Sequence, residues 1–186
     1  MKPKTMLLWV CACLLTTAAC SVSVDLTSTP VPATDTLPPT PITITEPVAE
    51  ATQTITVYFT NEPRFAVGTE PSEDAVVRQV PASADPMRAV LDQFFLGPTA
   101  EEFNGGLRLV ASGFTHVREF KVENGIARVY LGGVCANNGA AYSVGSLIMK
   151  NLSQFPQITA VKIYDENDST LDPDSANSSL PYCLEP

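Results

Sequence analysis

Proline and threonine dominate the chain from residue 21 to residue 53, and this stretch limits where a folded core can form. It contains no aromatic residue and reads SVSVDLTSTPVPATDTLPPTPITITEPVAEATQ. A segment with so few large apolar side chains cannot bury enough surface to offset the entropy lost on folding. Proline at this density favours an extended, polyproline-like backbone. We therefore expect a disordered linker here and one folded domain after it.

The residues before the linker resemble a bacterial export signal. Two lysines near the start precede an apolar run, residues 6–15, that is too short to span a bilayer. The following Thr-Ala-Ala-Cys at 17–20 is similar to a lipobox, in which small residues precede a cysteine that becomes the acylated N-terminus. We expect a signal peptide over 1–19, fatty acyl chains such as palmitate on Cys20, and a mature protein anchored at the outer side of the cell membrane. An unlipidated secretory protein or an uncleaved anchor is the alternative.

The charge of the chain excludes several classes of partner. The formal net charge is -9 and the sequence pI is about 4.5. The lysines and arginines are scattered rather than clustered with aromatic residues. Neither nucleic acid nor an anionic lipid surface is therefore an expected ligand, because binding to phosphates needs a basic patch.

Alternating and helical patterns begin at residue 54. Residues 54–59 and 75–80 have the alternation of half-buried strands. Asp85 and Pro86 are typical of the cap and first position of a helix, and Gly97-Pro98 of its end. The apolar residues between them recur at a spacing of three and four, which predicts a helix face that packs in the core.

A hairpin, a helix and a strand complete the predicted domain. Asn124-Gly125 favours a two-residue type I′ turn within residues 116–131. A second amphipathic helix is predicted over 141–155, and a last strand over 158–164. The order predicts an α+β fold over residues 54–165, a two-layer α/β sandwich with one mixed or antiparallel sheet of about five strands covered by two helices. Residues 166–186 form an acidic tail.

These segments together resemble the GerMN domain of bacterial sporulation and germination lipoproteins. The resemblance is carried by TITVYF at 54–59, VVRQVP at 76–81, AVLDQFFLGPTAEE at 89–102, VENGIARVYL at 122–131, LSQFP at 152–156 and AVKIY at 160–164. The LGPT corner at 96–99 and the LSQFP segment are its most specific parts. The resemblance implies an exported, lipid-anchored protein that serves as a non-catalytic binding or scaffolding module in cell-envelope assembly, without a cofactor. This chain has one copy of the domain and adds a cysteine-containing tail.

Two cysteines remain if the signal is removed and Cys20 is acylated. In an oxidising compartment such a pair favours a disulfide, so we expect Cys135 and Cys183 to join the tail to the domain. The only histidine, His116, could instead form a thiol-imidazole couple with Cys135, but we favour a histidine at a strand edge.

The start of the tail resembles a calcium loop only loosely. Asp165, Asn167 and Asp168 offer oxygen ligands, but the glycine needed for the sharp turn of such a loop is missing. We therefore expect a solvated turn and no metal. Adjacent Glu101 and Glu102 point in different directions and do not predict a paired-carboxylate hydrolase site.

The sequence thus favours a tethered binding module whose partner is an envelope protein or a cell-wall glycan. One alternative is a glycan-binding or hydrolytic envelope protein with its site near the glycine-rich residues 133–139. Another is a lipoprotein that binds calcium or a small ligand.

Overall fold

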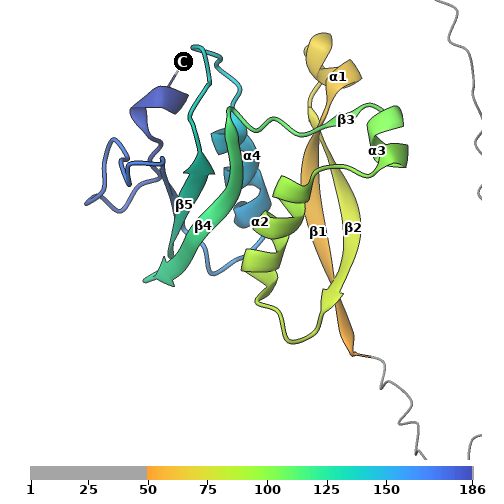
Figure 1. The fold of residues 1–186 in the computed structure, drawn as a ribbon, viewed down its shortest axis with the longest axis horizontal. Helices are drawn as coiled ribbons and strands as arrows, with labels where there is room; N and C mark the ends of the chain where they lie inside the picture. Colours follow the sequence, from red (N-terminus) through yellow and green to blue (C-terminus); the bar gives the residue numbers. More distant parts are fainter. Residues whose placement is uncertain (1–49, 186) are drawn as a thin grey trace, which may run out of the picture. The chain divides into compact units, whose positions relative to one another are not determined.

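Two helices lie between two β-sheets in the folded part of the chain (Figure 1). The structure is a computed structural model that describes residues 50–185. The predicted signal peptide, the lipidation site Cys20 and all but the end of the linker lie outside the described residues.

Each sheet has three strands. The first has the order β2-β1-β3 and the second the order β4-β5-β6. All neighbours are antiparallel except β5 and β6, which run parallel, so the second sheet is mixed. The strands are β1 (Thr52–Asn61), β2 (Glu73–Pro81), β3 (Leu107–Arg108), β4 (Phe114–Glu123), β5 (Ile126–Gly133) and β6 (Ala160–Tyr164).

Both long helices begin at a capping side chain. The helix α2 (Pro86–Leu96) starts where the sequence predicts, because the Asp85 carboxylate accepts a hydrogen bond from the Met87 amide. The helix α4 (Val144–Ser153) starts later than predicted, at the cap provided by the Ser143 hydroxyl. Two single-turn helices, α1 (Glu62–Ala66) and α3 (Ala100–Asn104), were not predicted, and a 3-10 turn covers Tyr182–Leu184. No helix in the described range is long and apolar enough to cross a membrane.

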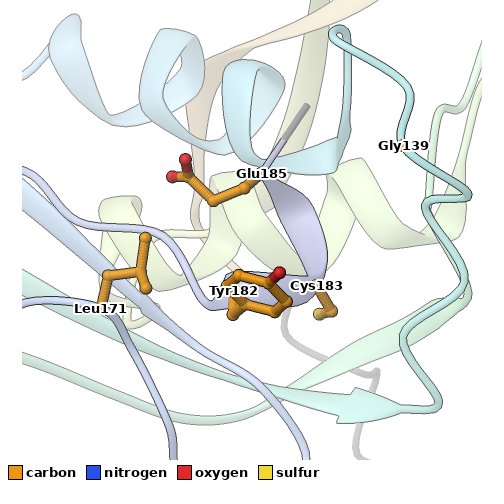
Figure 2. Close-up of a pocket in the computed structure, with 5 residues that line it drawn as sticks. All are labelled: Gly139, Leu171, Tyr182, Cys183 and Glu185. Carbon is orange, nitrogen blue, oxygen red and sulfur yellow. The ribbon is translucent and has the colours of Figure 1, made fainter.

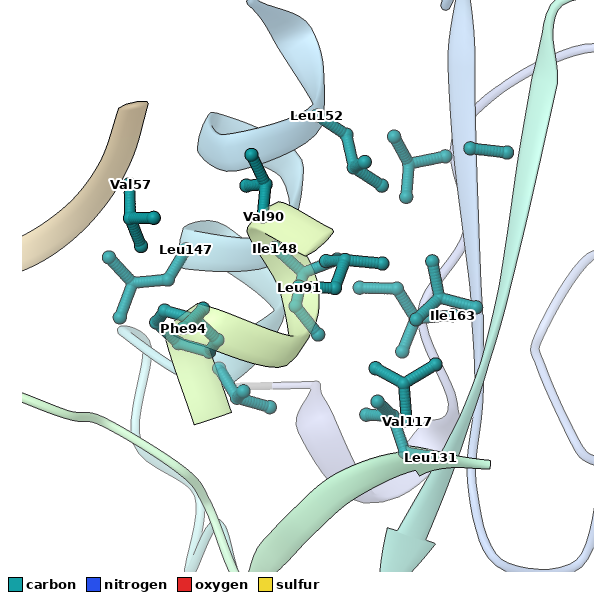
Figure 3. Packing of buried hydrophobic residues seen from close by; sticks show 14 of the residues in the cluster. Val57, Val90, Leu91, Phe94, Val117, Leu131, Leu147, Ile148, Leu152 and Ile163 are labelled. Carbon is teal, nitrogen blue, oxygen red and sulfur yellow. The ribbon is translucent and has the colours of Figure 1, made fainter. Parts of the chain in front are cut away.

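The core fills the space around the two long helices. Helix α2 contacts β1 and β4, while α4 contacts β1 and β6. Figure 3 shows Val57 of the first sheet on one side of these helices and Leu131 and Ile163 of the second sheet on the other. Because both helices are covered from two sides, the domain has three layers: sheet, helices, sheet.

The α+β class is confirmed, and the arrangement of the strands differs from the expectation. Instead of one sheet of about five strands in two layers, the strands form two sheets of three. The reason lies at the edge of β1 that faces away from β2. There the side chains of Asn151 and Gln154 from α4 bind the backbone of Tyr58 and Thr56, so no further strand can pair along this part of the edge.

The predicted hairpin is confirmed in detail. Asn124 and Gly125 have φ angles of 53° and 79°, as a type I′ turn requires. The register pairs Val122 with Ala127 and Lys121 with Arg128. A hydrogen bond with Glu119 raises the pKa of the Lys121 ammonium, so this acid offsets the like-charge pair on the exposed face.

Candidate functional site

An apolar groove opens where α2 turns into α3. Its volume is about 470 Å³. The side chains of Leu96 and Phe103 flank it and are 75% and 50% exposed. The groove is lined by Leu96, Gly97, Pro98, Ala100, Phe103, Asn104, Arg108 and Leu109. Large apolar side chains that stay exposed together mark a binding surface more often than a single exposed residue does.

The corner between the two helices has a fixed backbone. Gly97 ends α2 with a φ angle of 82°, a conformation that disfavours any residue with a Cβ. Thr99 then starts α3 with a capping box, in which its hydroxyl accepts from the Glu102 amide and the Glu102 carboxylate accepts from the Thr99 amide. The exposed apolar residues are therefore presented by an ordered turn.

One ion pair and one cation–π contact connect this corner to the first sheet. The Arg78 guanidinium of β2 donates two hydrogen bonds to the Glu102 carboxylate, one of them 2.7 Å long. These bonds lower the pKa of Glu102 from 4.5 to about 2. The Arg108 guanidinium lies 3.9 Å from the centre of the Phe103 ring and pairs with Glu62 at 2.8 Å.

The chemistry of the groove suits binding rather than catalysis. Arg108 is the one ionisable residue among those that line it. A guanidinium offers hydrogen-bond donors and no acceptor, so it does not serve as a general base. The groove can therefore hold an apolar side chain and pair its neighbouring carbonyl or carboxylate with Arg108.

A second pocket lies at the carboxyl-terminal turn (Figure 2). It has a volume of about 490 Å³ and is lined by Gly139, Leu171, Tyr182, Cys183 and Glu185. Glu185 is the one carboxylate among these residues, whereas hydrolysis of a glycosidic bond by paired carboxylates needs two. Of the glycine-rich stretch proposed for a hydrolytic site, only Gly139 reaches the lining.

The tail folds back on the second sheet. Cys135 and Cys183 form a disulfide, the pairing expected from the sequence, and Leu184 is buried in the core. The ammonium of Lys162, which is fully buried in β6, donates to the Asp172 carbonyl and to the Ser175 hydroxyl at 3.3 Å. The acidic tail is thus held by a covalent bond, by core packing and by a buried donor.

The remaining candidate residues do not form a reactive site in the structure. The Nδ1 atom of His116 is hydrogen-bonded to the Thr115 hydroxyl at 2.9 Å, and Cys135 has no free thiol to pair with it. The Asp165 carboxylate accepts from the backbone amides of Asn167 and Ser169, and Asp168 forms an ion pair with Arg118. These oxygens close a turn, and the described residues contain no cluster of three metal-binding side chains.

The sequence analysis did not predict the groove, although the sequence carries a signal for the helix α3 that borders it. Thr99 and Glu102 have the spacing of a capping box, which would have predicted α3. The exposure of Leu96 and Phe103 had no such signal, since it depends on which helix faces the two sheets cover.

The match to a protein-family model agrees with the resemblance to GerMN domains. A search of solved structures matches the tandem GerMN domains of the sporulation protein GerM from Bacillus subtilis, with 20% identity, a TM-score of 0.49 and coverage of 78% of this chain. The chain spans about half of that protein, 49% of its length. A search of the curated proteins gives no significant match. The family model named Germane, described as sporulation and spore germination, matches residues 56–170, which is more than half of the chain. The chain therefore belongs to the Germane family.

Proposed function

We propose that this protein is a membrane-tethered extracytoplasmic lipoprotein whose domain is a non-catalytic binding or scaffolding module in cell-envelope assembly. The observation that carries the binding role is the apolar groove with Leu96 and Phe103 exposed at an ordered corner. The family membership is consistent with this role. The lipobox-like Thr-Ala-Ala-Cys at 17–20 supports the tether.

The linker explains how such a module would work at a membrane. A polyproline-like chain rises about 3 Å per residue, so residues 21–53 would hold the domain roughly 50 to 100 Å from lipid on Cys20. The acidic charge of the chain disfavours contact with an anionic lipid surface. A module placed in this way would meet a partner at a distance from its own membrane.

The partner that fits the groove best is an envelope protein with an exposed apolar side chain next to a carboxylate. The apolar side chain would lie between Leu96 and Phe103. The carboxylate would compete with Glu62, which is 58% exposed, for the Arg108 guanidinium. Apolar burial would provide most of the affinity, and the ion pair would set the orientation.

Site-specific photocrosslinking in intact cells tests this proposal. A photoreactive residue at position 96 should capture one defined protein, while the same residue at Val134, which is 72% exposed, should not. The double change Leu96→Ser and Phe103→Ser should weaken binding of the captured protein at least tenfold. Equal capture from both positions, or capture of nothing from either, would refute the groove as the binding site. Capture of glycan instead of protein would refute the proposed class of partner.

A further inference from the structure

The second pocket, at the carboxyl-terminal turn, combines two exposed apolar side chains with a carboxylate. Leu171, Tyr182 and Glu185 line it together (Figure 2). Tyr182 is 80% exposed and Leu171 is 52% exposed. Large apolar side chains that stay exposed around a concave site are typical of a binding surface.

The walls of the second pocket are held in place by the rest of the domain. The Leu171 amide donates to the Leu180 carbonyl at 2.9 Å. On the opposite wall, Cys183 is held by the disulfide and Leu184 is buried in the core. Tyr182 lies on the same turn and is therefore presented at the surface by an anchored segment. Because the pocket is preformed, a ligand would lose little affinity to the ordering of its walls.

Glu185 gives the second pocket a negative charge that nothing in the described range neutralises. Its carboxylate forms no ion pair with residues 50–185. No lysine or arginine is among the residues that line the pocket. Residues 165–185 contain several acids and neither lysine nor arginine, so the tail itself supplies no cation.

The basic side chains that contact the tail are bound elsewhere. Arg118 forms its ion pair with Asp168, while Arg128 and Lys162 donate to backbone carbonyls of the tail. A cation from outside the described residues would therefore meet no competitor at Glu185.

The three side chains of the second pocket match the parts of a lysine side chain. The face of an aromatic ring such as that of Tyr182 attracts a cation, and the Glu185 carboxylate can pair with an ammonium. Leu171 offers an apolar contact to the aliphatic stem, which lysine carries below its compact charged end. An uncharged sugar could stack on the tyrosine ring but would leave the charge of Glu185 without a partner.

We propose that the second pocket binds a lysine side chain of a partner protein, with the ammonium between the Tyr182 ring and the Glu185 carboxylate. This site is separate from the groove at the corner of α2 and α3 and does not depend on the partner proposed there.

An NMR titration of the full chain in detergent, at constant ionic strength, tests the proposal with a defined probe. N-acetyl-lysine amide should shift the backbone amide signals of Tyr182 and Glu185 until they saturate, with a dissociation constant in the millimolar range. N-acetyl-norleucine amide keeps the aliphatic stem and lacks the ammonium. It should bind about fivefold more weakly.

Two variants separate the contributions of the charge and of the ring. Glu185→Gln should raise the dissociation constant of the lysine probe about fivefold. Tyr182→Leu, which keeps an apolar side chain without an aromatic face, should raise it about threefold. Glu166→Gln is the matched control, because it removes the same charge from an exposed acid of the tail that does not line the pocket. The three substituted side chains are exposed, so the other signals of each variant should match those of the parent.

Four results would overturn the proposal. Equal affinity for the lysine and norleucine probes would show that apolar contact alone explains the binding. Equal weakening by Glu166→Gln and Glu185→Gln would assign the binding to the overall charge of the tail. Tighter binding of N-acetylglucosamine at the same amides would identify a sugar site, and the absence of any saturable shift would show that the pocket binds no ammonium.

Discussion

The side chain of Asn151 in α4 pairs with both backbone groups of Tyr58 in β1. Its carbonyl oxygen accepts from the Tyr58 amide at 2.9 Å, and its amide nitrogen donates to the Tyr58 carbonyl at 3.0 Å. Asn151 is fully buried and also donates to the Leu147 carbonyl at 2.9 Å. One side chain thus substitutes for a neighbouring strand and fixes the helix against the edge of the sheet.

Replacing Asn151 with leucine should destabilise the fold strongly. Two backbone groups of Tyr58 would lose their partners, at about 1 to 3 kcal/mol each. We expect a loss of about 2 to 5 kcal/mol in the free energy of unfolding and faster hydrogen exchange of the Tyr58 amide. Ser153→Ala, on the exposed side of the same helix, should change stability by less than about 0.5 kcal/mol. Denaturant titration measures both, and equal stability of Asn151→Leu and the parent would contradict the role of Asn151.

Glu102 should make the fold sensitive to acid. Its pKa is lowered from 4.5 to about 2, chiefly by hydrogen bonds from Arg78. A carboxylate with a lowered pKa in the folded state contributes its full stability above pH 4.5 and loses it as the pH falls through about 2. The pair is 15% and 20% exposed, so water screens it, and we expect a contribution on the order of 1 to 2 kcal/mol.

The change Glu102→Gln should therefore flatten the pH dependence of unfolding between pH 4.5 and pH 2. Glu101→Gln is the matched control, because Glu101 is the exposed neighbour on the same turn and forms no ion pair with residues 50–185. Denaturant midpoints measured between pH 4.5 and pH 2 compare the stability of the two variants with that of the parent. The role of the Arg78 pair would be refuted if both variants kept the pH dependence of the parent.

Removing the disulfide should loosen the tail and lower stability. The bond links residues that are 48 positions apart, and closing a loop of this size contributes about 4 kcal/mol through the entropy of the unfolded chain. The double change Cys135→Ala and Cys183→Ala should lower the free energy of unfolding by about this amount. Reductant should destabilise the parent similarly and leave the double variant unchanged. A stable parent in reductant would show that Lys162 and the packing of Leu184 are sufficient to hold the tail.

Local patterns predicted the elements of this fold better than their assembly. Asp85-Pro86 and Asn124-Gly125 are signals contained within a few residues, and both features form where the sequence places them. The division into two sheets depends on hydrogen bonds from Asn151 to Tyr58, which are 93 residues apart. The spacing of apolar residues in α4 indicated one buried face of the helix. It did not show that the polar residue Asn151 would also be buried.

Part of the candidate groove could be predicted from the sequence. The LGPT corner at 96–99 was recognised as specific to the family. The spacing of apolar residues along a helix does not, however, distinguish a residue that is buried in the core from one that is exposed. Leu96 extends the apolar run of α2 and yet is 75% exposed. Only the position of the two sheets determines that Phe94 is buried and Leu96 is not.

Metabolic labelling with radioactive palmitate, followed by membrane fractionation, tests most directly whether this domain is anchored outside the cell membrane, as we propose. We expect label on the parent chain, recovery with the membranes, and cleavage by protease added to intact cells or spheroplasts. Cys20→Ala should remove the label and release the chain from the membrane. An unlabelled parent chain found in the cytosol would contradict the tethered module.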